Sequence, residues 1–187
     1  MSPGRTKPKV SEEYVVGLTD GEGCFYVNAW KSSAYKAGYG IQLHFHLKMQ
    51  EKDKPLLEKI RNTLDCGAVY FQKEQRTNHC QCYRYTVSSQ KDIFERVIPF
   101  FKRFSFFSST KKTNFSIFCQ IAKMMNNSDH YTAEGLRKII EIRETLNIGK
   151  ARKRKWELHH YDQFLVENPQ RPYARVKYRP KHLGGMR

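Results

Sequence analysis

Acidic side chains, long apolar runs and paired cysteines are all scarce in this sequence of 187 residues. It holds 18 Asp and Glu against 34 Lys and Arg, which leaves a formal net charge of +16. No run approaches the roughly 20 apolar residues that a membrane-spanning helix requires, and the basic start has no apolar stretch behind it. We therefore expect neither a membrane span nor a signal peptide. The five cysteines are an odd number without framework spacing, which favours free thiols in a reducing intracellular compartment.

The apolar content, by contrast, is that of a folded protein. Hydrophobic residues make up 39% and aromatic residues 13% of the chain, enough for a compact domain with a sizeable core. The excess of positive charge predicts a polyanionic partner, most simply a nucleic acid. An acidic membrane surface is the weaker alternative, because the sequence shows no apolar or lipid anchor.

Three regions differ in composition. Residues 1–10 form a basic arm interrupted by two prolines and a glycine, and residues 11–149 carry the periodic apolar patterns of a single α/β domain. Residues 150–187 hold 11 Lys or Arg against 3 acidic residues. We expect this basic C-terminal extension to wrap onto a partner, or to stay mobile until one binds, with a turn of helix near 156–164.

The patterns within the domain predict the order α-β-β-α-β-β-α, followed by two more helices. Ser11 is the expected N-cap of a first helix that ends near Asp20, because glycines follow it. Residues 41–50 alternate between apolar and polar side chains, which predicts a strand with one buried face. The remaining predicted elements are strands over 24–31, 68–73 and 81–87 and helices over 54–64, 92–101, 113–125 and 132–146.

The stretch YVVGLTDGEG, residues 14–23, carries the most information. Gly17 and Gly21 lie four residues apart, so one helical face could bring two backbones into close contact. Asp20 and Glu22 place two carboxylates where the helix dipole is already negative, which is unfavourable unless a cation binds beside them. Carboxylate and main-chain carbonyl oxygens at such a turn suit Mg²⁺.

This motif resembles the signature of the LAGLIDADG homing endonucleases, and the predicted element order matches the fold of that family over roughly residues 11–125. The resemblance implies an α+β fold of αββαββα order with an antiparallel, saddle-shaped sheet, to which this chain adds C-terminal helices and the basic tail. Members with one motif copy act as homodimers, in which the motif helices of two subunits pack together. The predicted dimer interface comprises Val16, Gly17, Asp20 and Gly21.

The resemblance also implies a metal site. Glu22, the second acid of the motif, is the expected catalytic metal ligand of each subunit, with the carbonyl of Gly21 beside it, and the expected ion is Mg²⁺ or Mn²⁺. The motif has Glu here where Asp is commoner in the family, a change that keeps the charge and the ligand type.

Two further catalytic positions follow from the same resemblance. The family's Gln after the second strand, which helps to order water near the metal, matches Met49 or Gln50. Its active-site lysine matches Lys111 or Lys112, and a lysine there offsets charge that develops on the phosphate.

The reaction so implied is phosphodiester hydrolysis. The metal ions would lower the pKa of water, orient it in line and stabilise the leaving 3′ oxygen. Each subunit cuts one strand, so a homodimer makes a double-strand break, with short 3′ overhangs, in a long, pseudo-palindromic DNA site. The biological role would be intron mobility, in a chloroplast or mitochondrion if the host is eukaryotic and in the cytoplasm otherwise.

The polar face of the first predicted hairpin supplies the expected DNA contacts, because a two-stranded ribbon fits the major groove. The predicted DNA-binding residues are Tyr26, Asn28, Trp30, Gln42, His44, His46 and Lys48, joined from the second hairpin by Tyr70, Gln72 and Arg84. The basic residues expected mostly to contact phosphates, which position the protein without reading sequence, are Lys31, Lys36, Lys73 and Arg76.

Two other functions and one other metal site stay open. An intron-splicing maturase would keep the sheet as a nucleic-acid-binding surface without catalysis, and a repressor would bind DNA as a dimer without metal. His79, Cys80 and Cys82, with Cys66 as a fourth ligand, form a weak candidate zinc site, because the C-x-C spacing lacks a second pair.

Overall fold

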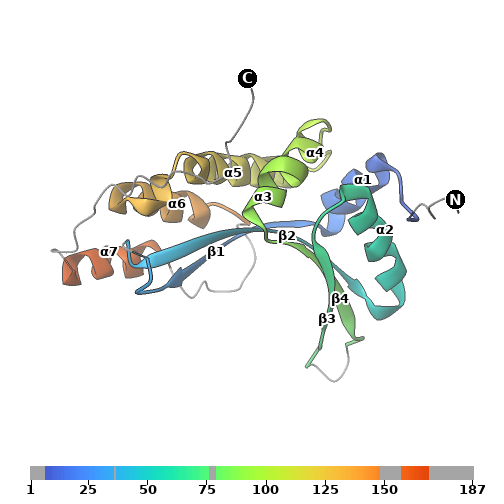
Figure 1. Ribbon diagram of the computed structural model, residues 1–187, viewed down its shortest axis with the longest axis horizontal. Coiled ribbons are helices and arrows are strands. Elements are labelled where there is room, and N and C mark those ends of the chain that lie inside the picture. The colour runs from blue at the N-terminus through green and yellow to red at the C-terminus, as the bar shows by residue number, and fades with distance from the viewer. Residues whose placement is uncertain (1–6, 36, 76–78, 148–156, 169–187) are drawn as a thin grey trace, which may run out of the picture. The chain divides into compact units, whose positions relative to one another are not determined.

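The structure, a computed structural model, describes residues 7–35, 37–75, 79–147 and 157–168. Four strands form one sheet in the order β1-β2-β4-β3, in which β4 pairs antiparallel with both β2 and β3 (Figure 1). In chain order the elements are α1 (Glu12–Glu22), β1 (Cys24–Lys31), β2 (Tyr39–Gln50), η1 (Glu51–Asp53), α2 (Lys54–Leu64), β3 (Ala68–Gln72), β4 (Cys82–Val87), α3 (Gln90–Asp92), η2 (Ile93–Val97), α4 (Ile98–Lys102), α5 (Ser109–Asn126), η3 (Asp129–Tyr131), α6 (Ala133–Glu144) and α7 (Leu158–Glu167).

The chain divides into two compact units. The first takes residues 1–28 and 42–119, and the second takes residues 29–41 and 120–187. None of the helices in the described ranges is both long and apolar enough to cross a membrane.

Helix α1 begins as the sequence predicts and ends two residues later than expected. The Ser11 hydroxyl accepts the N–H of Tyr14 at 3.2 Å, which satisfies one of the free donors of the first turn. The helix continues through Glu22, and the N–H of Gly23 then donates to the Thr19 carbonyl at 2.9 Å. A Cβ at position 23 would collide with Thr19, so glycine allows the chain to leave the helix at this point.

Phenylalanine rings form the core of the first unit. The Phe25 ring on β1 stacks on Phe45 of β2 at a centroid distance of 5.3 Å, and Phe101 of α4 contacts Phe45 at 5.1 Å. Helix α2 lies against β3 and β4 (Figure 1). The helix predicted over 92–101 is continuous from α3 through α4 but contains the π-helical turn η2, just before Pro99, which has no N–H to donate within a helix.

In the second unit the predicted tail helix is present and packed. Helix α7 buries Tyr161, whose ring meets Tyr39 edge-on at 5.1 Å and whose hydroxyl donates to the Ala37 carbonyl at 3.4 Å. Arg137 of α6 and Asp162 form an ion pair at 2.7 Å. The rest of the basic extension, 150–156 and 169–187, lies outside the described residues.

Candidate functional site

Helix α1 presents its two glycines to open space. Gly17 and Gly21 are both exposed, and a Cβ built at either position would have nothing within 4 Å. Val16, predicted at the same interface, is instead buried within its own unit at 7% exposure. The exposed face of α1 therefore carries both glycines together with Glu13 and Tyr14, and at the glycines no side chain keeps a second helix away.

Asp20, also predicted at the interface, is bound to its own chain. One carboxylate oxygen accepts the N–H of Phe107 at 2.8 Å, and the two oxygens accept the N–H of Ser108 at 3.0 and 3.2 Å. The Ser108 hydroxyl in turn accepts the N–H of Lys111 at 3.3 Å, in the first turn of α5. The motif helix is thereby tied to the amino end of α5.

Glu22 and Lys111 lie at the same end of α1. Glu22 is the exposed last residue of the helix, and within the described ranges its carboxylate has no hydrogen bond or ion pair. The ammonium group of Lys111 donates to the carbonyl of Gly23, the next residue along the chain. Lys112 is exposed on α5, so Lys111 is the lysine whose side chain reaches the motif.

Gln50 and Met49 end strand β2 on opposite faces. Gln50 is exposed and lies opposite Cys82 of β4, whereas Met49 pairs with Tyr83. Because side chains alternate along a strand, Gln50 shares the polar face of β2 and Met49 lies on the other face. Gln50 is therefore the more accessible of the two candidates.

The donor set at the end of α1 suits a hard cation. Carboxylate oxygens of Glu22 and the Gly21 carbonyl are the oxygen ligands that Mg²⁺ takes, and they lie at the negative end of the helix dipole. Among the described residues, no three His, Cys, Asp or Glu side chains are placed together to hold a metal ion.

The candidate zinc site is not formed within the described part of the chain. His79, Cys80, Cys82 and Cys66 all belong to that part, and no three of them lie together as metal ligands. The Cys66 thiol instead contacts the hydroxyl of Tyr85 at 3.7 Å, and Cys82 donates to the Cys80 carbonyl at 3.3 Å. All five cysteines are free thiols, as expected from their number and spacing.

Strands β2, β4 and β3 share one polar face, because their register aligns the polar positions of both hairpins. Three rows of facing residues cross these strands: His46, Thr86 and Ala68; Lys48, Arg84 and Tyr70; Gln50, Cys82 and Gln72. The sequence could indicate which residues of each hairpin share a face. Only the pairing of β2 with β4 brings the polar residues of the two hairpins onto one common face. We call these three rows the polar sheet face.

A histidine pair extends the polar sheet face toward β1. The rings of His44 and His46 stack at 5.2 Å, and the Tyr26 ring lies 6.0 and 6.3 Å from them. Burial, with the nearby positive charge of Arg84, lowers the pKa of both histidines, that of His46 to about 4. Both rings are therefore neutral near pH 7 and able to accept as well as donate a hydrogen bond.

Two buried polar atoms of this cluster have no partner within the described part of the chain. They are Nδ1 of His44 and Nε of Arg84. The Nδ1 atom of His46, by contrast, lies 3.1 Å from the Thr86 hydroxyl. Because buried polar atoms are seldom left unsatisfied, the cluster retains hydrogen-bonding capacity for a ligand.

The other predicted DNA-binding residues have contacts within their own units. Gln42 donates to the Ser88 carbonyl at 3.3 Å, and the Tyr26 hydroxyl lies 3.5 Å from Oδ1 of Asn28. Lys48 pairs with Glu74 at 3.4 Å, an acid that is not among the predicted site residues. No local pattern marks Glu74, because it lies 26 residues from Lys48 in the chain.

Three of the residues predicted to contact DNA are not part of the polar sheet face. In the second unit, the Trp30 ring packs edge-on against Tyr35 at 5.9 Å, and the Lys31 ammonium lies 5.4 Å from the centre of the Phe164 ring. Lys73 is exposed just after β3. Lys36 and Arg76 lie outside the described residues.

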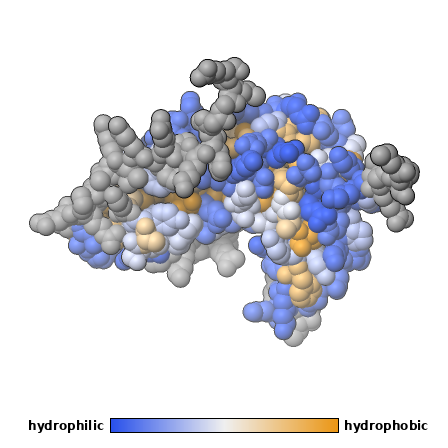
Figure 2. Space-filling view, in the orientation of Figure 1, coloured by the Kyte–Doolittle hydropathy of each residue, from blue (hydrophilic) through white to orange (hydrophobic). Residues whose placement is uncertain are grey.

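An apolar surface accompanies the second hairpin. Figure 2 shows it as hydrophobic surface over β3 and β4, where Phe71 is 52% exposed. The Phe71 ring meets Tyr83 edge-on at 5.5 Å. Because Phe71 alternates with Tyr70 and Gln72 along the strand, it lies on the face opposite the polar sheet face.

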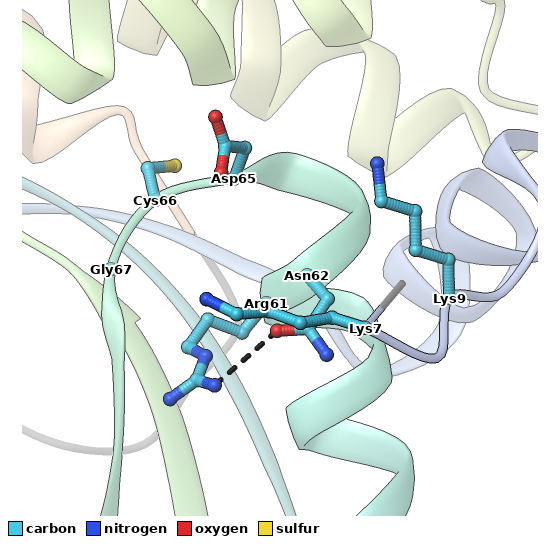
Figure 3. A pocket seen from close by; sticks show the side chains of 7 residues that line it. All are labelled: Lys7, Lys9, Arg61, Asn62, Asp65, Cys66 and Gly67. Atoms are coloured by element: carbon cyan, nitrogen blue, oxygen red, sulfur yellow. Dashed lines mark hydrogen bonds between the residues drawn. The ribbon is translucent and has the colours of Figure 1, made fainter. Parts of the chain in front are cut away.

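A basic hollow lies between the N-terminal segment and the carboxyl end of α2. Its lining residues are Lys7, Lys9, Arg61, Asn62, Asp65, Cys66 and Gly67 (Figure 3). Asn62 donates to the Pro8 carbonyl at 3.0 Å, and Thr63 bonds both the N–H and the carbonyl of Val10, so residues 7–10 are held on α2. The two lysines lie at the negative end of the α2 dipole. This favourable interaction explains their position without any anionic ligand.

The chain is similar in sequence to known endonucleases. The sequence model of the LAGLIDADG endonuclease family matches residues 15–122. The chain is 33% identical over 140 residues to "Probable intron-encoded endonuclease 2" of Neurospora crassa, covering 75% of this chain and 30% of that protein. It is 34% identical over 103 residues to "Probable intron-encoded DNA endonuclease 1" of Mycosarcoma maydis, covering 55% of this chain and 34% of that protein. The chain thus spans about a third of the length of the curated relatives it matches.

Solved structures show the same fold. A homing endonuclease, I-TnaI, superimposes with a TM-score of 0.68 at 30% identity, covering 85% of this chain and 98% of that one. The structure of I-SmaMI bound to an uncleaved DNA target in the presence of calcium ions superimposes with a TM-score of 0.68 at 25% identity, covering 87% of this chain and 50% of that one. The predicted αββαββα fold is confirmed.

Proposed function

Because the chain belongs to the LAGLIDADG endonuclease family, we propose that it is a site-specific double-strand DNA endonuclease that acts as a homodimer with a divalent metal ion. Each subunit hydrolyses one phosphodiester, and the cut promotes mobility of the intron that encodes the protein. The observation that carries this proposal is the exposed carboxylate of Glu22 at the end of a helix with an open glycine face, where the Lys111 ammonium group donates to the carbonyl of the next residue, Gly23.

Pairing of two motif helices completes the site. Gly17 and Gly21 leave the surface of α1 open to a second backbone, and a second copy of the chain would bring its own Glu22 to the same place. Two carboxylates without a counter-ion would repel each other, so this arrangement favours cation binding.

The chemistry divides between the metal and the chain. Glu22 and the Gly21 carbonyl would hold Mg²⁺ or Mn²⁺, which when bound activates water and stabilises charge on the phosphate. Lys111, fixed at Gly23, offsets the negative charge that develops at the reacting phosphate. Gln50, accessible at the end of β2, would hold water by its amide.

The polar sheet face binds the DNA target. It combines the cations Lys48 and Arg84 with the neutral imidazoles of His44 and His46, so it offers donors and acceptors to base edges. The net charge of +16 supplies the non-specific attraction to phosphates. The DNA-bound state of I-SmaMI, a protein of the same fold, supports DNA as the partner.

The substitution Glu22→Gln tests the proposal, because it removes the charge and keeps the size of the side chain. The protein is incubated with Mg²⁺ and a randomised DNA pool, and the cut ends are sequenced to identify the site. On that site we expect Glu22→Gln to lower the single-turnover rate by at least about 100-fold and to leave DNA binding in Ca²⁺ within about threefold.

The matched control is Glu13→Gln, which makes the same charge change at an exposed position of the same helix. It should cut at the wild-type rate. Loss of binding together with cutting in Glu22→Gln would contradict the catalytic role. A wild-type protein that binds nucleic acid but yields no cut ends at any divalent ion concentration would instead indicate a maturase or a repressor.

A further inference from the structure

We propose that Asp20 is a positioning residue that holds the ammonium group of Lys111 at the cleavage site by clamping the amino end of α5 onto the carboxyl end of α1. This inference rests on the proposed function. Two connections join the helix ends. The Asp20 carboxylate accepts the N–H groups of Phe107 and Ser108, and Lys111 donates to the Gly23 carbonyl.

The carboxylate of Asp20 is committed to these bonds. Both of its oxygens accept the N–H of Ser108, and one also accepts the N–H of Phe107. Hydrogen bonds from main-chain N–H groups to an ionised acceptor are about twice as strong as neutral ones. Asp20 is therefore a structural acceptor within its own subunit, whereas Glu22, two residues on, keeps its oxygens free of such partners within the described ranges.

The clamp also explains why an acid is tolerated in the last turn of α1. A carboxylate there is disfavoured by the negative end of the helix dipole. Phe107 and Ser108 immediately precede α5, so the same carboxylate lies at the positive end of that second dipole. The carboxyl end of one helix and the amino end of the other thus meet across Asp20.

Ser108 transmits the position of Asp20 to Lys111. Its hydroxyl accepts the N–H of Lys111 at 3.3 Å, and its carbonyl accepts the N–H of Lys112 at 3.0 Å, so Ser108 begins the first turn of α5. Lys111 lies in that turn. A displacement of about an ångström at a catalytic group can lower a rate about 100-fold, so loosening this turn should slow cutting without removing any group that contacts DNA.

The test is a double-mutant cycle between Asp20→Asn and Lys111→Met. The amide of Asp20→Asn keeps one acceptor oxygen and presents an NH₂ group to the Phe107 and Ser108 donors. We expect it to lower the single-turnover rate on saturating DNA by about 10- to 100-fold, with DNA affinity changed by less than about threefold. In the Lys111→Met background the same substitution should lower the rate by less than about twofold, because residues that act through one another are not additive.

Independent effects in the cycle, or a loss of DNA affinity equal to the loss of rate, would overturn the inference. Glu13→Gln again controls for the charge change. All variants are compared well below their melting temperatures, and Asp20→Asn should show the same circular dichroism spectrum as wild type.

A measurement on the unmodified protein covers the case in which Asp20→Asn fails to fold. Amide hydrogen exchange should be slow at Phe107 and Ser108 relative to the exposed Ser105. Exchange at all three as fast as in an unstructured peptide would overturn the clamp. This readout needs no cutting, so it stays decisive even if the wild-type protein proves not to be a nuclease.

Discussion

The side-chain ammonium of Lys111 hydrogen-bonds to the main-chain carbonyl of Gly23, the residue that caps the motif helix α1. The two residues are 88 positions apart in the chain. This contact brings a positive charge to the carbonyl of the residue that follows Glu22, and it distinguishes Lys111 from its exposed neighbour Lys112.

The two lysines should therefore differ in their contribution to catalysis. We expect Lys111→Met to lower the single-turnover cleavage rate by about 100-fold, because in the proposed mechanism its fixed positive charge offsets charge on the reacting phosphate. Lys112→Met should change that rate by less than about threefold, since an exposed lysine acts mainly through long-range attraction. Rapid-quench cleavage of a defined site measures both, and equal effects of the two substitutions would contradict the assignment.

Gly17 should control subunit association. A Cβ at this position would have nothing within 4 Å, and leucine favours the helix over glycine by up to about 1 kcal/mol. Gly17→Leu should therefore keep or raise the melting temperature of the subunit while weakening dimerisation at least about tenfold and abolishing double-strand cutting. Analytical ultracentrifugation, with and without the DNA site, measures the assembly.

The exposed Lys59 of α2 provides a matched control for this substitution. Lys59→Leu adds the same apolar side chain on a different helix and should leave association unchanged. A wild-type chain that remains a monomer on its DNA site would contradict the homodimer itself.

His46 should make the folded state less stable in acid. Its pKa is lowered to about 4 by burial, by Arg84 and by His44, whereas an unfolded-state histidine titrates near 6.5. As the pH falls from about 6.5 towards 4, the unfolded state binds the proton first, so stability is lost over that window. Between pH 7 and 4.5 the free energy of unfolding should therefore fall by about 1–2 kcal/mol less in His46→Gln than in wild type, a value that allows for the partial exposure of His46.

Urea unfolding of both proteins at the two pH values measures this difference. Carboxylates elsewhere also titrate in the window, but they are common to both proteins and cancel in the comparison. If the free energy of unfolding changed equally with pH in wild type and His46→Gln, His46 would not be the group that destabilises the fold in acid.

Gly38 should be intolerant of any side chain. Its φ of +78° lies in the left-handed region, and a Cβ there would collide with the Phe164 ring of α7. Gly38→Ala should lower the free energy of unfolding by about 2–4 kcal/mol, because backbone strain and overpacking add. Gly21→Ala, at an open helical position, is the control and should not destabilise the subunit.

Thermal unfolding followed by circular dichroism measures the stability of Gly38→Ala and of Gly21→Ala. Adding Phe164→Ala to Gly38→Ala should relieve the collision but not the backbone strain, so the two substitutions should interact. A simple sum of the two single effects would argue against the packing of Phe164 on Gly38.

Much of the fold could be predicted from local patterns. The alternation from Ile41 to Gln50 gave the buried and polar faces of β2 correctly, and the Ser11 cap located the start of α1. The end of α1 was predicted two residues early, because glycine is a weak stop signal and the closing contact depends on how Gly23 packs against Thr19. Burial of Val16 depended likewise on what packs against the helix.

The sequence by itself determined the motif, the polar character of one sheet face and the positive charge. These are properties of single residues or of neighbours a few positions apart, where helical and strand periodicity apply. Only the tertiary structure decided that Lys111 rather than Lys112 reaches the motif, that Asp20 holds α5, and that Arg84 lies between Lys48 and Tyr70. Those relationships join distant parts of the chain, and their partners are set by the path of the backbone and the packing of the core, which no local spacing encodes.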